Sequence, residues 1–232
     1  MHAPAENSSA RLTITPPPGF RPSTQGFGFI NRFPALPKRE RLFYGLCGGM
    51  CFAALDLLNA GRDLPADTDP PARNTRLYRY LVWRQIASFG RGGRYIPRYV
   101  LWMFLSDAEV QRRTLIAYQD IETRLAAGEK IVLGLLYNSI RETLAVWENH
   151  QVLAYYGEAV NEGRTVIPIY DPNRPGDDSG YLLCQRVPVG EKNGKPLHGL
   201  MCEQQSARYK PSPVRGFFPV LDYQPVEPPD FG

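Results

Sequence analysis

The sequence predicts an α+β fold in which a helical first half packs on an antiparallel sheet. Helical periodicity dominates residues 45–128, and short β-type runs dominate residues 129–225. Helices first and strands second are typical of α+β folds rather than of alternating α/β folds. Hydrophobic residues make up 43% and charged residues 22% of the chain, which are the proportions of an ordinary globular protein. A chain of 232 residues is long enough to bury a sizeable core.

Residues 1–24 predict an extended N-terminal arm. They are polar and proline-containing, and they include no apolar run of the kind found in a signal peptide. No stretch of the chain reaches the roughly 18 apolar residues expected of a membrane span. We therefore expect a cytoplasmic protein without a membrane span, in which residues 25–232 form a single domain with a helical half at 45–128 and a sheet half at 129–225.

The first long helix is expected at residues 50–59. Large and small residues alternate earlier in the chain, at 26–33, and predict a short strand or an extended ledge there. The helix is apolar on every face except at Asp56, and Gly61 ends it. Because a helix that is hydrophobic all round is a buried one, it should lie between the two halves of the domain. Asp56 is then expected to pair with a buried arginine or a polar network.

Three further helices and six strands complete the expected fold. The helices are expected at 74–89, at 97–105, and from a cap at Ser106 or Asp107 to Gly128, with apolar residues every three to four positions in the last one. After Gly128 the pattern changes to β-type runs. The strands are expected at 130–137, 150–156, 164–170, 180–184, 197–203 and 216–223.

Cys47 is the first candidate for a reactive side chain because it precedes the buried helix directly. The thiolate is the nucleophilic form of cysteine, and the partial positive charge of a helix N-terminus favours it. Gly48 and Gly49 follow Cys47, and glycines allow a substrate carbonyl to approach backbone N–H groups that can face an oxyanion. Cys51 falls one turn inside the helix, where a cysteine behaves as a small hydrophobe.

His150 is the candidate base. The chain has three histidines, of which His2 lies in the arm and His198 in a stretch flanked by Pro and Gly, whereas His150 opens a strand. Asp171 ends the next predicted strand, and an acceptor in that place can hold an imidazole in one tautomer. Asp171 is therefore the candidate orienting group, with Asn173 as the alternative.

These three segments together resemble the papain-like cysteine peptidase superfamily, closest to its bacterial C39-like branch. In that family a Cys-Gly pair starts the central helix, a His-x-Val motif opens a strand, and a Tyr-Asp-Pro-Asn motif ends the next strand. The matching segments here lie within residues 26–60 and 130–175. The resemblance implies a papain-like cysteine proteinase fold in which Cys47 is the nucleophile, His150 the base and Asp171 the orienting acceptor.

The sequence departs from this family in the oxyanion hole. Members commonly carry a glutamine shortly before the nucleophile, and its amide group completes the hole. The positions before Cys47 hold no amide side chain, and the nearest candidates are Asn31 and Gln25, which would have to reach the site through folding. The loss of one oxyanion donor can slow a reaction by about 10²–10³.

The resemblance implies a cysteine-dependent hydrolase of the peptidase or amidase kind, or an acyl transferase, that acts on an amide or ester carbonyl. A peptide or amide is the expected substrate. The missing glutamine favours an alternative, in which a catalytically weak or inactive papain-like protein serves as a binding module. A third hypothesis is an interaction module that uses the proline-containing arm as a docking segment.

No cofactor, metal or nucleic-acid partner is expected. The four cysteines are too few for a disulfide scaffold and predict reduced thiols. Zinc ligands usually come in tight pairs, but Cys184 and Cys202 stand far apart in the sequence. A net charge of +4 is small and dispersed, which argues against nucleic-acid binding. The glycine-rich residues 90–94 lack the Lys-Ser/Thr of a phosphate loop, and we expect a connection between helices there.

Overall fold

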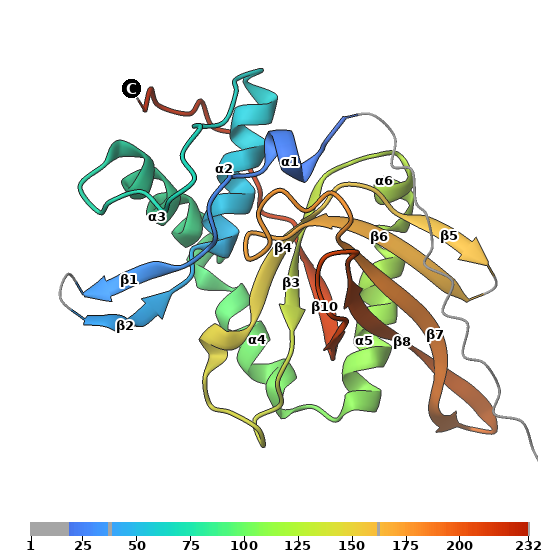
Figure 1. The fold of residues 1–232 in the computed structure, drawn as a ribbon. Coiled ribbons are helices and arrows are strands. Elements are labelled where there is room, and N and C mark those ends of the chain that lie inside the picture. Colours follow the sequence, from blue (N-terminus) through green and yellow to red (C-terminus); the bar gives the residue numbers. More distant parts are fainter. Residues whose placement is uncertain (1–18, 37–38, 162, 232) are drawn as a thin grey trace, which may run out of the picture.

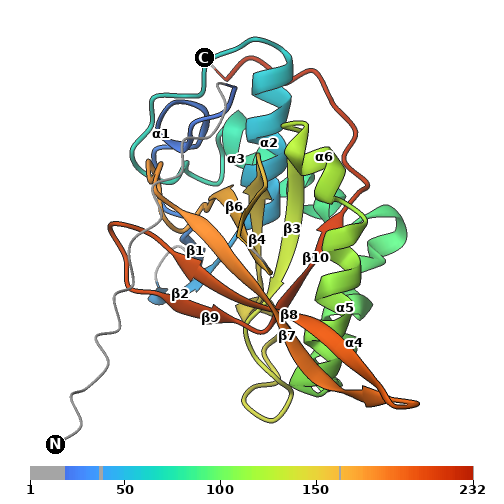
Figure 2. The same ribbon diagram turned by 90° about the vertical axis from the view of Figure 1, so that its right-hand side faces the viewer.

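The computed structural model describes residues 19–36, 39–161 and 163–231. N-terminal helices pack on a nearly closed, barrel-like antiparallel sheet (Figures 1 and 2). This arrangement confirms the predicted α+β class, with a helical N-terminal half on an antiparallel sheet. Residues 1–18 of the expected arm lie outside the described residues, and the arm's last residues form the short helix α1 (Pro22–Gln25). In the part of the chain that is described, no helix is long and apolar enough to cross a membrane.

The helices follow the predicted order, with one interruption. They are α2 (Cys47–Asn59), α3 (Arg76–Ser88), α4 (Tyr95–Phe104), α5 (Asp107–Gln119) and α6 (Glu122–Ala126), with 3₁₀ turns η1 (Arg91–Gly93) and η2 (Val146–Glu148). Ser106 caps α5, because its side chain accepts a hydrogen bond from the backbone N–H of Glu109 at 3.3 Å. The single helix expected up to Gly128 is wrong, since the chain turns at Asp120 and restarts as α6.

The main sheet has the strand order β10-β3-β4-β6-β7-β8-β9, and every neighbouring pair is antiparallel. The eighth strand of this sheet, β5, pairs with β6 alone, and β1 and β2 form a separate hairpin that projects from the helical half (Figure 1). The strands are β1 (Phe33–Leu36), β2 (Arg39–Tyr44), β3 (Ile131–Leu136), β4 (His150–Ala154), β5 (Glu158–Asn161), β6 (Arg164–Tyr170), β7 (Tyr181–Lys192), β8 (Lys195–Gln205), β9 (Ser212–Val214) and β10 (Gly216–Val220).

The strand expected at residues 26–33 is wrong. Most of this segment is irregular, and strand structure begins only at Phe33. The alternation that suggested a strand reflects burial instead, because Phe27 and Phe29 are both fully buried. The backbone N–H of Phe27 donates to the hydroxyl of Tyr170 at 3.2 Å, so a side chain takes the place of a partner strand.

The central strands are buried on both faces. In β3, Ile131, Leu133 and Leu135 belong to the core on the side of α5, and Val132 and Leu136 belong to the core on the side of α2. This alternation follows from the two-residue period of a strand. The helix α2 packs against α3 on one side and β4 on the other, which confirms its expected place between the two halves.

Two glycines allow α2 to approach its neighbours closely. A Cβ atom at Gly49 would lie 2.2 Å from the backbone carbonyl oxygen of Leu81 in α3. A Cβ atom at Gly48 would lie 1.6 Å from Oε1 of Gln151 in β4. Glycine lowers helix stability by about 1 kcal/mol relative to alanine. Here it is required because neither neighbour leaves room for a side chain.

Asp56 pairs with a buried arginine, as expected. Its Oδ1 accepts a hydrogen bond from Nη2 of Arg84 at 3.0 Å, and Nε of Arg84 lies 2.7 Å from Oδ2 without the alignment of a hydrogen bond. The hydroxyls of Tyr80 and Tyr223 also donate to this carboxylate, at 2.8 and 2.9 Å. The C-terminal segment that contains Tyr223 runs beside α2 (Figure 1). Asp56 therefore ties this segment to the helix that begins with Cys47.

Candidate active site

Cys47 is the first residue of α2, at the end of the β1–β2 hairpin and its short connection. The backbone N–H of Leu46, directly before it, donates to Oδ1 of Asn31 at 2.5 Å. The helical bonds begin here, with the N–H of Met50 donating to the carbonyl of Leu46 at 2.8 Å. Cys47 is partly exposed and lines a pocket, so the thiol lies at the positive end of the helix and is accessible.

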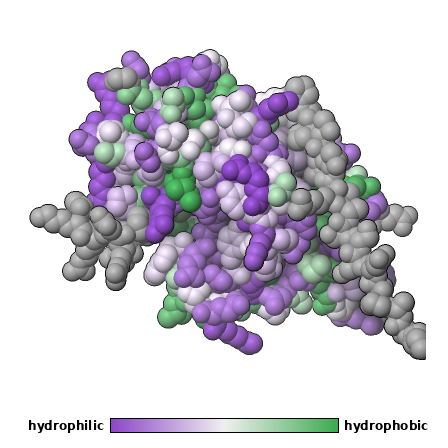
Figure 3. Space-filling model, in the orientation of Figure 1, coloured by the Kyte–Doolittle hydropathy of each residue, from purple (hydrophilic) through white to green (hydrophobic). Residues whose placement is uncertain are grey.

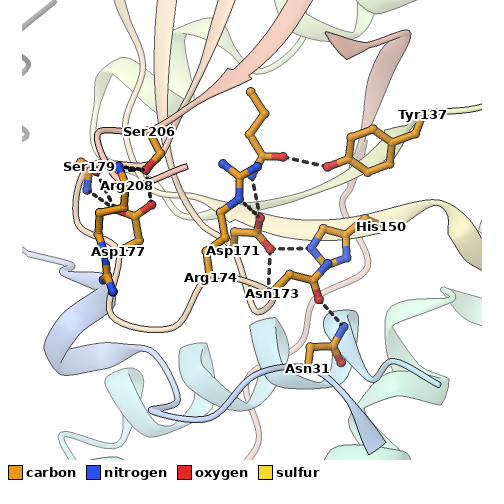
Figure 4. Close-up of polar contacts among 11 residues, drawn as sticks. Asn31, Tyr137, His150, Asp171, Asn173, Arg174, Asp177, Ser179, Ser206 and Arg208 are labelled. Atoms are coloured by element: carbon orange, nitrogen blue, oxygen red, sulfur yellow. Dashed lines mark hydrogen bonds and ion pairs between the residues drawn. The ribbon is translucent and has the colours of Figure 1, made fainter. Parts of the chain in front are cut away.

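The sheet brings His150 and Asp171 together. Leu153 of β4 pairs with Tyr170, the last residue of β6, in an antiparallel register. Continuing that register places Asp171, the next residue, opposite Val152, and His150 lies two residues before Val152 in β4. Nε2 of His150 is 2.7 Å from Oδ1 of Asp171, as the dashed line in Figure 4 marks. The hydroxyl of Tyr99 donates to the carbonyl of His150 at 2.9 Å and fixes this end of the strand.

Asp171 is held from several directions. Its Oδ1 also accepts the backbone N–H of Asn173 at 2.8 Å, and its Oδ2 accepts Nε2 of Gln204 at 2.6 Å (Figure 4). Nε of Arg174 lies 3.5 Å from Oδ2. Burial alone would raise the pKa of this carboxyl, but the charge of His150 and these hydrogen bonds lower the pKa below its usual value. The carboxylate form is therefore favoured.

The thiol and the imidazole line the same pocket and shift each other's pKa. Burial would raise the pKa of Cys47, but the charge of His150 and a hydrogen bond from it bring the pKa below its ordinary value. Burial would lower the pKa of His150, but the charges of Asp171 and Cys47 raise it to about 10. Since Asp171 occupies Nε2, Nδ1 is the ring nitrogen left for the thiol. These shifts favour the charged pair, a thiolate beside an imidazolium.

Cys51 has a different environment from Cys47. It is fully buried one turn later in α2, where its Sγ lies 3.8 Å from the carbonyl oxygen of Gln151. Burial raises the pKa of this thiol well above its ordinary value. Cys51 thus stays a protonated, packed side chain, and Cys47 is the cysteine of the pair that can supply a nucleophile.

The expected support residues fall into two groups. Asn31 and Asn173 line the same pocket as Cys47, and Nδ2 of Asn31 donates to Oδ1 of Asn173 at 3.1 Å (Figure 4). Gln25 lies in α1, outside the pocket lining, where its side chain accepts hydrogen bonds from Arg21 and Thr24.

The two glycines after Cys47 are engaged in different ways. The backbone N–H of Gly49 donates to Oε1 of Gln85 at 2.9 Å and is occupied. The backbone of Gly48 instead lowers the pKa of the Cys47 thiol. Asp171 rather than Asn173 contacts the imidazole, so the side chain of Asn173 instead connects the site to Asn31.

Gln204 and Tyr137 help to hold the site, but no motif in the sequence around either residue indicates this role. Gln204 of β8 donates to Asp171, and its Oε1 accepts the hydroxyl of Tyr137 at 2.8 Å (Figure 4). Gln204 is only 1% exposed, so its amide lies in a dry environment where each hydrogen bond counts more. Its approach to Asp171 depends on the pairing of β7 with β8, which no nearby residue specifies.

Replacing Gln204 with leucine is expected to destabilise the fold by about 1–3 kcal/mol, because Asp171 and Tyr137 each lose a buried partner. The lost donor also raises the folded-state pKa of Asp171. The ionised carboxylate contributes stability above its unfolded pKa of about 3.9, and this stability disappears as pH falls through the folded pKa. Acid unfolding should therefore begin at a higher pH in Gln204→Leu.

The neighbouring Gln205→Leu is the matched control for urea and acid unfolding. The hydroxyl of Tyr181 donates to Oε1 of Gln205 at 2.8 Å, and Gln205 does not contact Asp171. Equal losses in the two variants would contradict a specific support role for Gln204.

A pocket of about 560 Å³ opens above the thiol and the imidazole. Its walls come from the start of α2, the ends of α3 and α4, and the loop between β3 and β4. Its lining includes aromatic side chains and uncharged amides: Tyr44, Phe89, Tyr99, Tyr137, Trp147, Asn31, Gln85, Asn149 and Asn173. On the face drawn in Figure 3, hydrophobic residues gather in small separate groups. The pocket is large enough for a substrate side chain and the bond beside it.

The cysteines do not form a common set. Cys184 and Cys202 face each other across β7 and β8, with 3.2 Å between their sulfurs. They belong to the core on the α5 side of the sheet, whereas Cys51 belongs to the core on the α2 side. Among the described residues, no group of three or more His, Cys, Asp and Glu side chains is arranged to hold a metal ion.

Comparison with protein-family models, with curated proteins and with solved structures finds no match to this chain. The geometry of Cys47, His150 and Asp171 is therefore the basis for any statement about its function.

Proposed function

We propose that this chain is a cysteine-dependent hydrolase or acyl transferase that acts on amide or ester carbonyls, built on a papain-like fold. One observation carries the proposal: a partly exposed thiol at a helix start shares a pocket with an imidazole whose Nε2 lies 2.7 Å from a buried carboxylate, and the imidazole lowers the pKa of the thiol. A nucleophile, a base and an orienting acceptor in this order are the parts of a catalytic triad.

The chemistry assigns one role to each side chain. The Cys47 thiolate attacks the substrate carbonyl carbon and forms a tetrahedral oxyanion. The His150 imidazolium then donates its Nδ1 proton to the leaving amine or alkoxide, and the acyl group remains on sulfur. Neutral His150 next takes a proton from water or another acceptor, which attacks the thioester and releases the acid or the transferred acyl product. Asp171 holds the imidazole in one orientation throughout.

Asn31 is the side chain best placed to replace the glutamine of the family. Its Oδ1 is held by the N–H of Leu46, and one Nδ2 hydrogen is directed to Asn173. The amide carries a second hydrogen, and Asn31 lines the pocket beside Cys47. We assign this hydrogen and the backbone N–H of Cys47 to the oxyanion.

Two features support a papain-like fold for this site. The nucleophile begins a buried helix that lies between the helical half and the sheet, and the base and its acceptor come from adjacent antiparallel strands. Function is argued from the site, because one fold can host many activities.

The reaction of the protein with p-nitrophenyl acetate tests the proposal. We expect a rapid release of nitrophenol, an acetyl group on Cys47 in peptide mass spectrometry, and slower steady turnover as the thioester is hydrolysed. Cys47→Ala should abolish the burst, and Cys51→Ala should retain it. A Cys47 acetylation rate equal to that of a free thiol would instead support the alternative, an inactive protein that keeps the fold as a binding module.

A further inference from the structure

Among the residues that the structure describes, Glu148 is the one formally charged side chain in the pocket lining besides the Cys47–His150 pair. No lysine or arginine of the described residues lines this pocket. If the thiolate and the imidazolium neutralise each other, and Arg174 beside Asp171 offsets the charge of that carboxylate, Glu148 at the wall gives the cleft a negative character.

The position of Glu148 is fixed by the loop that carries it. It ends the turn η2, two residues before His150. Its Oε2 accepts Nδ2 of Asn138 at 3.0 Å, and the N–H of Glu148 donates to the carbonyl of Ala145 at 3.0 Å. One oxygen is thus anchored, and Oε1 has no hydrogen bond or ion pair within the described chain. A carboxylate held in this way can receive a cation with little loss of side-chain freedom.

Trp147 adds an aromatic surface beside this carboxylate. It lines the same pocket, yet 84% of its surface is exposed, so the fold does not use its indole as core. Trp is the aromatic side chain that attracts a cation most strongly, and a carboxylate beside it adds ordinary charge attraction. An exposed indole and a carboxylate on one rim together suit a cationic group that also carries apolar surface.

We infer that the cleft takes substrates with a cationic group next to the reacting carbonyl, such as a lysine or arginine side chain, with Glu148 as the counter-ion and Trp147 as the aromatic wall. This inference rests on the proposed function, because the same thiol must face the substrate. It adds a substrate class, which the triad alone does not define.

Methanethiosulfonate reagents of different charge test the inference. The Cys47 thiolate attacks the thiosulfonate sulfur, a mixed disulfide forms and methanesulfinate leaves, so no oxidant is needed. We compare the rates of the trimethylammonioethyl and sulfonatoethyl reagents at low ionic strength, with Cys47→Ala as the background. Glu148→Gln should reduce the ratio of cationic to anionic rates about fivefold or more. Trp147→Leu should slow the cationic reagent about twofold or more.

Glu142→Gln is the matched control, because Glu142 lies in the same loop outside the pocket lining and caps the N–H of Ser139. It should leave the rate ratio nearly unchanged. Fast reaction of Cys47 with a ratio that Glu148→Gln does not change would overturn the cationic substrate class and leave the proposed hydrolase intact. An unchanged rate with the cationic reagent in Trp147→Leu would contradict the role of Trp147 as the aromatic wall. A Cys47 thiol that reacts no faster than a free thiol with both reagents would overturn the inference together with the proposed function.

Discussion

Replacing His150 with alanine is expected to slow the alkylation of Cys47 by iodoacetamide at pH 6 about a hundredfold. An ordinary thiol with a pKa of about 8.5 is only about 0.3% ionised at this pH, so full ionisation raises the reactive fraction by at most about 300-fold. A thiolate of lower pKa is intrinsically less nucleophilic, which reduces this gain. Burial opposes ionisation of Cys47, and once His150 is absent only backbone hydrogen bonds from Gly48 and Gln151 counter it, which restores a large loss.

The measurement is the second-order rate of modification of Cys47, followed by peptide mass spectrometry from pH 5 to 9. His198→Ala is the matched control, because His198 lies on β8 outside the pocket lining. Circular dichroism should show that both variants are folded. A folded His150→Ala protein with a wild-type rate at pH 6 would contradict the thiolate–imidazolium pair.

The same pair predicts a bell-shaped pH dependence of ester hydrolysis. Activity should rise as pH increases through the lowered pKa of Cys47, because the thiolate forms there. It should fall as pH increases through about 10, where His150 loses the proton that the leaving group needs. In His150→Ala the alkaline decline should vanish, and reactivity should only rise with pH.

Sequence patterns could predict the candidate residues that begin or end a helix or strand. Cys47 starts a buried helix, and His150 and Asp171 stand at the ends of strands that pair with each other. Chemistry limits which residue types suit these places, so a helix start and two strand ends suffice to name the three residues. The antiparallel pairing of β4 with β6 then brings His150 close to Asp171.

Sequence patterns could not predict residues whose role depends on strand register. Gln204 reaches Asp171 because β8 runs beside β7 as far as Gln205, two residues past the end of the strand expected at 197–203. An Asn-Gly pair at residues 193 and 194 turns this hairpin, with φ values of 54° and 72°, and such a pair is a strong hairpin signal. The signal predicts the hairpin but not which side chains of β8 lie over Asp171.

Replacing Asp56 with alanine is expected to destabilise the protein by about 3–5 kcal/mol, because it leaves the buried guanidinium of Arg84 without its anion. Arg84 is only 2% exposed, so water cannot take the place of the lost carboxylate. The hydroxyls of Tyr80 and Tyr223 and the N–H of Val226 lose the same acceptor. Urea unfolding of the full chain measures the loss.

Asp222→Ala is the control for this result. Asp222 pairs with Arg94, whose side chain is 54% exposed, and pairs of that kind contribute about 1 kcal/mol or less. Similar losses for the two aspartates would contradict a special role for the buried pair. The C-terminal segment should also become more accessible to protease in Asp56→Ala, because Tyr223 and Val226 lose their anchor on α2.

A double replacement can separate the free-energy cost of burying the Asp56 carboxylate from the stability that its pairing with Arg84 contributes. Burial raises the pKa of the Asp56 carboxyl despite the surrounding donors, so desolvation outweighs the favourable contacts with the charged form. A buried pair of this kind contributes little net stability even though breaking it is costly. Asp56→Leu combined with Arg84→Met should therefore destabilise the chain less than Asp56→Ala alone. If the double variant is at least as unstable, the tyrosine and backbone bonds to Asp56, rather than the unpaired guanidinium, account for the loss.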